Sequence, residues 1–280
     1  MMLYESQTRV VFELMRNAEN NHYTRAVLAN AEPYIQFDVY PGKTVVQTNG
    51  DGFTTADVEA ICQITVSTKT HTATSFQTGG RGIGFKAIFM MSSKAYINSG
   101  LFSLFFDPGP GDSGLDMITP VYCEHEEILE EPLTRITLAL LDKLDREYLK
   151  NQFRDLPGTI LLFLEKLKRI TINEYDAVGT LSESVTYNRN SGNSRHGMTT
   201  LEEVFQLNGE PPKIEWRWYY ITKKQLCNFP SDNQSDYNAT EVVLAFPLHI
   251  NDVPIIEQQD VYRYFPIRNL GFSVSLFAKR

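Results

Sequence analysis

The feature that most constrains the fold is a cluster of glycines in the stretch Gly79-Gly80-Arg81-Gly82-Ile83-Gly84-Phe85-Lys86. Because glycine has no side chain and accepts positive φ, such a loop brings backbone N–H groups close to a ligand. An apolar, helix-compatible run from Phe85 to Met91 follows, and a helix that begins there adds the positive end of its dipole. A polyphosphate is therefore the natural ligand, with Lys86 as an additional cation. A plain turn is the alternative.

Two phosphate-binding motifs do not fit this stretch, and a third stays open. A Walker loop ends in Gly-Lys-Ser/Thr, whereas Phe85 separates Gly84 from Lys86. A protein kinase needs His-Arg-Asp and Asp-Phe-Gly motifs, which the sequence lacks. The dinucleotide fingerprint needs a buried strand before the glycines, and the preceding STKTHTATSFQT is polar. Because Asp107 follows FSLFF at a suitable distance, the dinucleotide motif is weakened rather than excluded.

Composition limits the class of protein and its partners. The chain has 280 residues, 42% hydrophobic and 21% charged, which is ordinary globular composition and enough for one large domain or two smaller ones. Its net charge of −8 argues against broad nucleic-acid binding. Three widely spaced cysteines favour a reducing compartment. Neither a signal peptide nor an apolar run long enough to cross a bilayer is present. We expect an intracellular protein, cytoplasmic or nuclear, with no membrane partner.

The first elements follow from periodicity. Residues 5–22 predict a helix, and its apolar face is formed by Val10, Val11, Leu14, Met15 and Ala18. Glu13, Asn17 and Asn20 share another stripe of that helix, which spacing alone assigns to solvent. The segments YIQFDVY and TVVQT flank Pro41-Gly42-Lys43 and predict a β-hairpin. After the turn NGDGF, Thr54 and Asp57 predict a capping box that opens a helix.

The rest of the chain predicts an α+β fold. Strands are expected at AYINSG, LFSLFF, MITPVY, TRITLALL and KRITINEY, and helices at LDREYLKNQF and TILLFLEKL. We expect helices on one face of a sheet in a first domain of residues 1–175. The sequence becomes more polar near residue 176, and this change predicts a second α/β or β-rich region over residues 176–280. There the stripe Ile214, Trp216, Trp218 and Tyr220 is expected to face the core.

Three boxes occur in a fixed order: ELMRNAENN (13–21), TNGDGFTTADVEAIC (48–62) and GGRGIGFKAIF (79–89). Together they resemble the GHKL, or Bergerat-fold, ATPases, which include gyrase B, heat-shock chaperone ATPases, histidine kinases and MutL-type repair proteins. The boxes are most similar to the plant NO VEIN and sacsin-like branch. The resemblance covers roughly residues 5–140 and weakly more. It implies a Bergerat-type two-layer α/β sandwich that binds ATP and Mg²⁺.

The resemblance also implies roles for particular residues. Glu13 matches the glutamate that orients and deprotonates the attacking water, and Asn17 matches the asparagine that binds magnesium. Thr134 matches a threonine that completes the hydrogen bonds on the adenine side. The remaining nucleotide-binding positions are Gly50 and Gly52 beside adenine, Ser67, Thr68 and Lys69 near the lid, and Gly79, Gly82, Ile83, Gly84, Phe85 and Lys86 around the phosphates.

The adenine pocket departs from the superfamily pattern. Most members have an aspartate that accepts the adenine amino group, and Thr48 takes that place here. A hydroxyl can still accept a hydrogen bond, but without the charge and with less reach. A one-residue shift of the turn, in which Asn49 or Asp51 contacts the base, is the alternative.

The leading functional hypothesis is a slow, magnesium-dependent ATPase of chaperone-like type. In it, nucleotide orders a lid and couples to a protein partner or to self-association as a homodimer. One alternative is a scaffold that binds nucleotide without hydrolysing it. Another is a Bergerat fold that serves as a small-molecule biosynthetic enzyme through ligation or phosphoryl transfer.

Overall fold

A computed structural model describes residues 6–62, 85–108, 119–123, 134–144, 146–190, 198–227, 239–263, 265–269 and 274–279. The chain is mixed α/β and mostly sheet, with few helices, in agreement with the broad α+β prediction. It divides into two compact units, Met1–Leu156 with Thr171–Ser184, and Pro157–Ile170 with Val185–Arg280. The expected boundary after residue 175 falls within the Thr171–Ser184 part of the first unit and stays a prediction.

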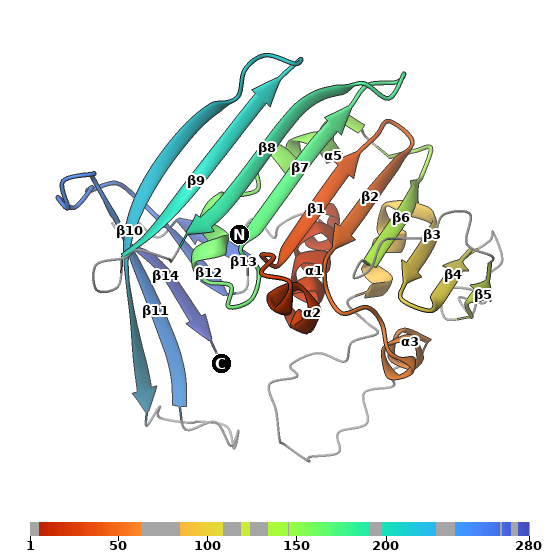
Figure 1. Cartoon of the computed structure of the whole chain (residues 1–280), viewed down its shortest axis with the longest axis horizontal. Coiled ribbons are helices and arrows are strands. Elements are labelled where there is room, and N and C mark those ends of the chain that lie inside the picture. The colour runs from red at the N-terminus through yellow and green to blue at the C-terminus, as the bar shows by residue number, and fades with distance from the viewer. Residues whose placement is uncertain are drawn as a thin grey trace. The chain divides into compact units, whose positions relative to one another are not determined.

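The first unit is built on a sheet whose strands run in the order β7-β1-β2-β6-β3-β4-β5 (Figure 1). These strands are β1 Tyr34–Val39, β2 Lys43–Thr48, β3 Ser92–Ser99, β4 Phe102–Phe106, β5 Val121–Tyr122, β6 Thr134–Leu140 and β7 Arg169–Tyr175, whose first two residues belong to the second unit. Its helices are α1 Ser6–Asn20, α2 Thr24–Leu28, α3 Thr55–Cys62, the 3-10 helix η1 Ala87–Met90 and α5 Arg146–Arg154. The hairpin predicted around residues 41–43 is present, with β1 and β2 antiparallel.

The core of the first unit lies where α1 and α5 cover one face of the sheet. The two helices contact each other, and the ring of Phe153 on α5 packs 5.2 Å from that of Phe37 on β1. The expected apolar face of α1 is confirmed, because Val10, Val11, Leu14, Met15 and Ala18 are all buried. Residues of β6 alternate between buried and half-buried, as expected when one face of a strand packs against helices.

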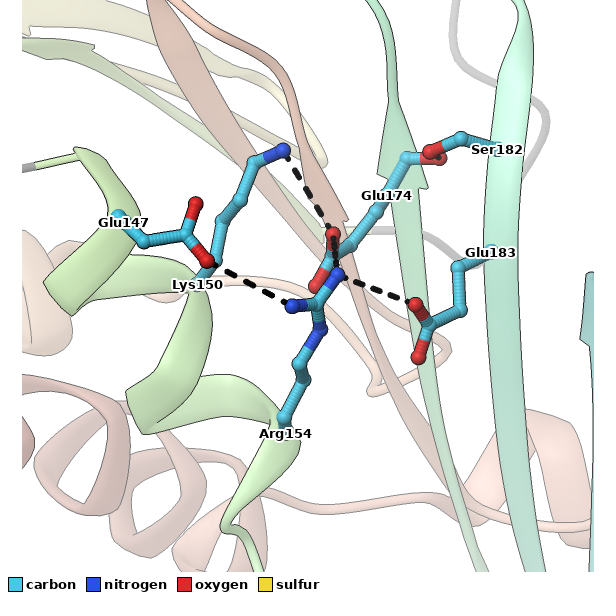
Figure 2. Close-up of polar contacts among 6 residues, drawn as sticks. All are labelled: Glu147, Lys150, Arg154, Glu174, Ser182 and Glu183. Carbon is cyan, nitrogen blue, oxygen red and sulfur yellow. Dashed lines mark hydrogen bonds and ion pairs between the residues drawn. The ribbon is translucent and has the colours of Figure 1, made fainter.

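An ion-pair network connects α5 to β7 and to the start of the next strand (Figure 2). The Arg154 guanidinium lies 3.0 Å from Glu174 on β7 and 3.1 Å from Glu183 at the start of β8. Lys150 approaches Glu174 to 3.7 Å, and Glu147 approaches Arg154 to the same distance. Burial raises the pKa of Glu174, and the charge of Arg154 opposes that rise. The buried carboxylate is thus held by two cations from one helix.

The capping box predicted at Thr54 is present. The backbone N–H of Thr54 donates to the Asp57 carboxylate at 2.9 Å, and the N–H of Asp57 donates to the Thr54 hydroxyl at 3.2 Å. Thr54 and Asp57 therefore satisfy each other's backbone donors at the start of α3, as the spacing predicts.

Two expected helices are much shorter than predicted. In the run Phe85–Met91, Phe85 and Lys86 are helical and are followed by the 3-10 helix η1, which ends at Met90. The strand β3 begins two residues later, at Ser92. The segment TILLFLEKL forms only the 3-10 helix η3, Gly158–Leu162. The carbonyls of Leu161 and Leu164 accept hydrogen bonds from Arg189. The Arg189 side chain competes with helical N–H groups for these carbonyls. Because Arg189 lies far along the chain, helix propensity within the segment could not predict this competition.

The second unit is also a sheet, in the order β13-β12-β14-β11-β10-β9-β8. Its strands are β8 Leu181–Asn190, which begins in the first unit, β9 Met198–Leu207, β10 Lys213–Cys227, β11 Ala239–Leu248, β12 Asp260–Arg263, β13 Phe265–Asn269 and β14 Ser275–Lys279. β12 runs parallel to β14, while β9, β10 and β11 are antiparallel neighbours. The sheet is therefore mixed.

The expectation that the stripe on β10 faces the core is wrong. Ile214, Trp216 and Tyr220 are 51%, 45% and 43% exposed, and Trp218 is half-buried, whereas Tyr219 on the opposite face is buried. A period of two identifies the residues that share a face of a strand, but it does not say which face packs. Apolar character alone therefore did not identify which residues of β10 are buried.

Candidate functional site

The first unit contains a cavity of about 410 Å³ between α1, the ends of β2 and β6, and the turn that leads into α3. Its wall combines amide, hydroxyl and apolar side chains. The wall is formed by Leu14, Asn17, Ala18, Asn20, Asn21, His22, Thr24, Val46, Thr48, Asp51, Gly52, Phe53, Thr54, Asp57, Phe85, Thr134 and Ile136. The volume lies within the range of small-molecule sites, roughly 300–1,000 Å³.

One side of the cavity is the C-terminal half of α1. Residues three and four apart share a helix face, so Leu14, Asn17, Ala18 and Asn21 follow one another along the wall. Leu14 and Ala18 are buried, whereas Asn17 and Asn21 are half-buried. This side of the cavity wall thus combines the amide side chains of Asn17 and Asn21 with the apolar side chains of Leu14 and Ala18. The stripe of Glu13, Asn17 and Asn20, which spacing assigned to solvent, is not simply solvated, because Glu13 is buried and the two asparagines border the cavity.

The floor of the cavity carries hydroxyl groups from neighbouring strands. Thr48 on β2 lies directly opposite Thr134 on β6, and Thr134 lies opposite Ser99 on β3. The Ser99 and Thr134 hydroxyl oxygens are 2.6 Å apart, and the Phe53 N–H donates to Ser99 at 2.9 Å. Thr48 is only 6% exposed, and its hydroxyl has no hydrogen-bond partner in the described part of the chain. A buried, unpartnered hydroxyl at a cavity wall is suited to a ligand.

The turn beside the floor is held by its own polar groups. The side chain of Asn49 accepts from the N–H of Tyr34 at 2.9 Å and donates to the carbonyl of Glu32 at 2.9 Å. The Asp51 carboxylate accepts from the backbone N–H groups of Thr24 at 3.0 Å and Arg25 at 2.9 Å, at the start of α2. Both side chains are therefore engaged in fixing the turn, whereas the Thr48 hydroxyl has no partner in the described part of the chain.

Two glycines of this turn suit its close geometry. A side chain at Gly50 would meet the Asn21 amide nitrogen and the His22 carbonyl at 3.3 Å. Gly52 has a φ of +89°, which side-chain-bearing residues rarely adopt. The glycines thus allow the turn to lie close against the end of α1.

Asp51 gives a pH-dependent prediction. Desolvation alone raises the pKa of Asp51, but the hydrogen bonds from Arg25 and Thr24, with the charge of Arg25, hold it below the ordinary value of 3.8. A lowered carboxyl pKa stabilises the fold above the ordinary pKa, and this contribution is lost as the pH falls through the lowered pKa. We expect Asp51→Asn to reduce the free energy of unfolding by about 1 kcal/mol at pH 7, because the amide has one acceptor oxygen in place of two and carries no charge.

Urea denaturation of wild type and Asp51→Asn between pH 7 and pH 2 measures this effect. The difference between the two proteins should shrink below about pH 4. Asp142→Asn, which changes an exposed aspartate of the same unit, serves as the control. A difference that does not depend on pH would show that the carboxylate charge is not what stabilises α2.

Glu13 lies one helical turn before Asn17 and is 4% exposed, but of the described residues it does not form part of the cavity wall. Its carboxylate forms an ion pair of 2.5 Å with Arg16. Lys86 is half-buried and follows Phe85, which lines the cavity. Seven other predicted positions lie outside the described residues: Ser67, Thr68, Lys69, Gly79, Gly82, Ile83 and Gly84.

Several residues of this region were not predicted. Ser99 carries no local signal, because its role depends on pairing with β6, far along the chain. The amide of Asn21 could have been found, since it follows Asn17 by one helical turn. In the described part of the chain, no group of three or more His, Cys, Asp and Glu side chains could hold a metal ion. No described helix is long and apolar enough to cross a membrane.

The comparisons with known proteins give one distant relative. The chain is 25% identical over 290 residues to Protein NO VEIN of Arabidopsis thaliana, a match that covers 96% of the chain and 10% of the plant protein. The chain thus spans about a tenth of the length of that relative. No family model matches the chain. Among solved structures, it is similar to the N-terminal domain of a DNA repair protein, with a TM-score of 0.45 and 13% identity over 92% of the chain and 73% of that structure.

Proposed function

We propose that the first unit binds ATP with Mg²⁺ in this cavity, as a GHKL-type (Bergerat-fold) nucleotide-binding domain, and hydrolyses ATP slowly. The observation that carries the proposal is the buried hydroxyl of Thr48, which lacks a partner in the described chain and lies at the floor of a 410 Å³ cavity. The same cavity joins α1 from the first sequence box to the turn of the second. The distant similarity to NO VEIN, a branch that the boxes resemble, agrees with the proposal.

The wall of the cavity fits a purine nucleotide at one end. Val46, Ile136 and Leu14 supply the apolar surface that a planar base needs, and Thr48 and Thr134 supply hydroxyls for its polar edge. A purine makes hydrogen bonds in the plane of its ring and apolar contacts through its two faces, which suits hydroxyls with aliphatic groups beside them. The floor is therefore the base-binding end of the site in this proposal.

Asn17 is the residue that would hold magnesium. Its amide oxygen is a hard, neutral ligand of the kind that Mg²⁺ accepts together with phosphate oxygens and water. A bound magnesium ion would neutralise charge on the phosphates. Because a site of this kind needs few protein ligands, it does not depend on a cluster of acidic side chains. The half-buried position of Asn17 on the cavity wall suits this role.

The proposal predicts that magnesium strengthens ATP binding through Asn17. We expect Asn17→Ala to weaken binding of magnesium ATP by about tenfold, which corresponds to about 1.4 kcal/mol. Titration calorimetry with Mg²⁺ and with EDTA measures the effect in wild type and variant. Asn151→Ala, at an exposed position on α5, is the control. Wild-type affinity that is the same with and without Mg²⁺ would refute the role of Asn17.

Hydrolysis is assigned to Glu13, which would orient the attacking water and take its proton. The ion pair with Arg16 and the position of Glu13 off the described wall favour a second candidate function, a scaffold that binds nucleotide without turning it over. In both candidates the nucleotide state would control a lid and an association with a partner protein or a second copy. Measuring phosphate release under saturating magnesium ATP separates the two.

A further inference from the structure

We propose that a second copy of this chain docks on the open face of strands β9, β10 and β11, about a two-fold axis beside Tyr220. These strands lie wholly in the second unit. The inference gives a surface to the association with a second copy that the proposed function includes, and its test needs no nucleotide. It starts from the aromatic stripe of β10, which the fold leaves exposed.

The two faces of these strands differ in burial. Residues directly opposite one another on neighbouring strands point to the same face, so the strand registers assign each side chain to a face. One face is packed, because Leu201, Tyr219 and Ala245 are each 3% exposed or less. The other, which we call the open face, carries exposed or half-buried apolar side chains: Met198 and Val204 on β9, Ile214, Trp216, Trp218 and Tyr220 on β10, and Leu244 and Phe246 on β11.

The open face has the composition of a protein–protein interface. Met198 on β9 and Phe246 on β11 lie on either side of Tyr220, and the rings of Tyr220 and Phe246 are 6.4 Å apart. The apolar surface is therefore continuous across three strands. Tryptophan and tyrosine are enriched in binding hot spots, whereas continuous exposed apolar surface is uncommon on monomeric proteins. The composition thus favours a partner that covers Trp216 and Tyr220.

Charge indicates that this partner is a second copy. The chain has a net charge of −8, so two copies repel each other in most orientations. On the open face, the described residues of the three strands include two charged side chains, Glu202 and Lys224, whose charges cancel. A face without net charge does not repel its own copy, and it offers no attraction to nucleic acid or to a strongly charged protein. The open face is therefore suited to self-association.

A two-fold axis beside Tyr220 brings the two charges together between copies. Glu202 lies opposite Trp216, towards one end of the open face, and Lys224 lies towards the other end of β10. Position 220 is midway between positions 216 and 224. A two-fold axis that lies between the packed sheets and crosses β10 at Tyr220 therefore places Glu202 of each copy near Lys224 of the other. The aromatic side chains meet at the centre of this interface, between the two charge pairs.

Analytical ultracentrifugation of the full chain without nucleotide tests the surface. Wild type should form a dimer whose fraction rises with protein concentration. Tyr220→Glu should weaken dimerisation by at least about tenfold, because a residue on the axis meets its own equivalent and the two carboxylates repel each other. Tyr122→Glu is the matched control, since Tyr122 is an exposed tyrosine on β5 of the first unit. It should dimerise as wild type does.

The two charged residues test the position of the axis. Glu202→Lys and Lys224→Glu should each weaken dimerisation by about fivefold, because each variant places like charges together twice in the dimer. A mixture of the two variants should associate more tightly than either variant alone, since a copy with two lysines then meets a copy with two glutamates. A loss of folding in one variant would not produce this recovery.

Three results would overturn the inference. Wild type that stays monomeric at about 100 μM, where an interface of micromolar affinity is largely dimeric, would refute the surface and leave the proposed nucleotide site standing. A wild-type dimer that a folded Tyr220→Glu leaves intact would show that another surface pairs. A mixture that associates no more tightly than its components would refute the axis at Tyr220. Wild type that dimerises but binds no ATP would refute the nucleotide site and retain this surface.

Discussion

The Glu13→Gln variant is expected to bind magnesium ATP as tightly as wild type and to hydrolyse it about 10²–10⁴-fold more slowly. Glutamine keeps the shape of the side chain and can still hydrogen-bond, but it cannot take a proton from water. Since the base acts in the transition state, ground-state affinity is retained. Calorimetry measures the binding, and phosphate release in single turnover measures the chemical step.

Glu19→Gln is the matched control for this experiment, because Glu19 lies on the same helix and outside the described cavity wall. It should hydrolyse ATP at the wild-type rate. A Glu13→Gln variant that also keeps the wild-type rate would remove Glu13 from the reaction. If wild type itself releases no phosphate while binding ATP, the non-hydrolysing scaffold becomes the better description.

The Arg189→Leu variant is expected to lower the free energy of unfolding of the second unit by about 3–5 kcal/mol. Arg189 is buried and donates to carbonyls within and after η3: Leu161 at 2.6 Å, Leu164, Glu165 at 3.3 Å and Leu167 at 3.3 Å. Leucine leaves these carbonyls without their donor, and an unsatisfied buried group costs about 1–3 kcal/mol.

Arg217→Leu provides the control, because the side chain of Arg217 is 56% exposed and lies 3.8 Å from Glu203. A surface pair of this kind contributes only about 0–1 kcal/mol. Urea denaturation followed by tryptophan fluorescence measures both variants, since Trp216 and Trp218 lie on β10 of the same unit. Equal stabilities of the two variants would show that water replaces the Arg189 guanidinium without loss.

Elements set by local sequence were predicted well. The apolar face of α1, the hairpin of β1 and β2, and the capping box at Thr54 depend on residues within a few positions of one another. In each case the local preference agrees with the tertiary packing, so periodicity and turn chemistry are sufficient. Asn17 and Thr48 were proposed as site residues from the resemblance of the sequence boxes, whereas spacing alone assigned Asn17 to solvent.

Features that depend on distant residues were missed. Arg189 takes the carbonyls that a helix after Thr159 would use. Asp51 fixes the start of α2, a helix that spacing did not reveal, through bonds to residues 26 and 27 positions earlier. Ser99 reaches Thr134 across strands 35 positions apart in the chain. No local pattern carries such information, because it arises only when the strands pair.

The central claim is that a nucleotide occupies the cavity of the first unit with its base at the hydroxyl floor. A crystal structure of the chain with Mg²⁺ and a non-hydrolysable ATP analogue tests it most directly. The account predicts the base against Thr48 and Thr134, and the magnesium-bound phosphates on the side of Asn17. An analogue bound elsewhere, or a cavity that stays empty at saturating analogue, would contradict it.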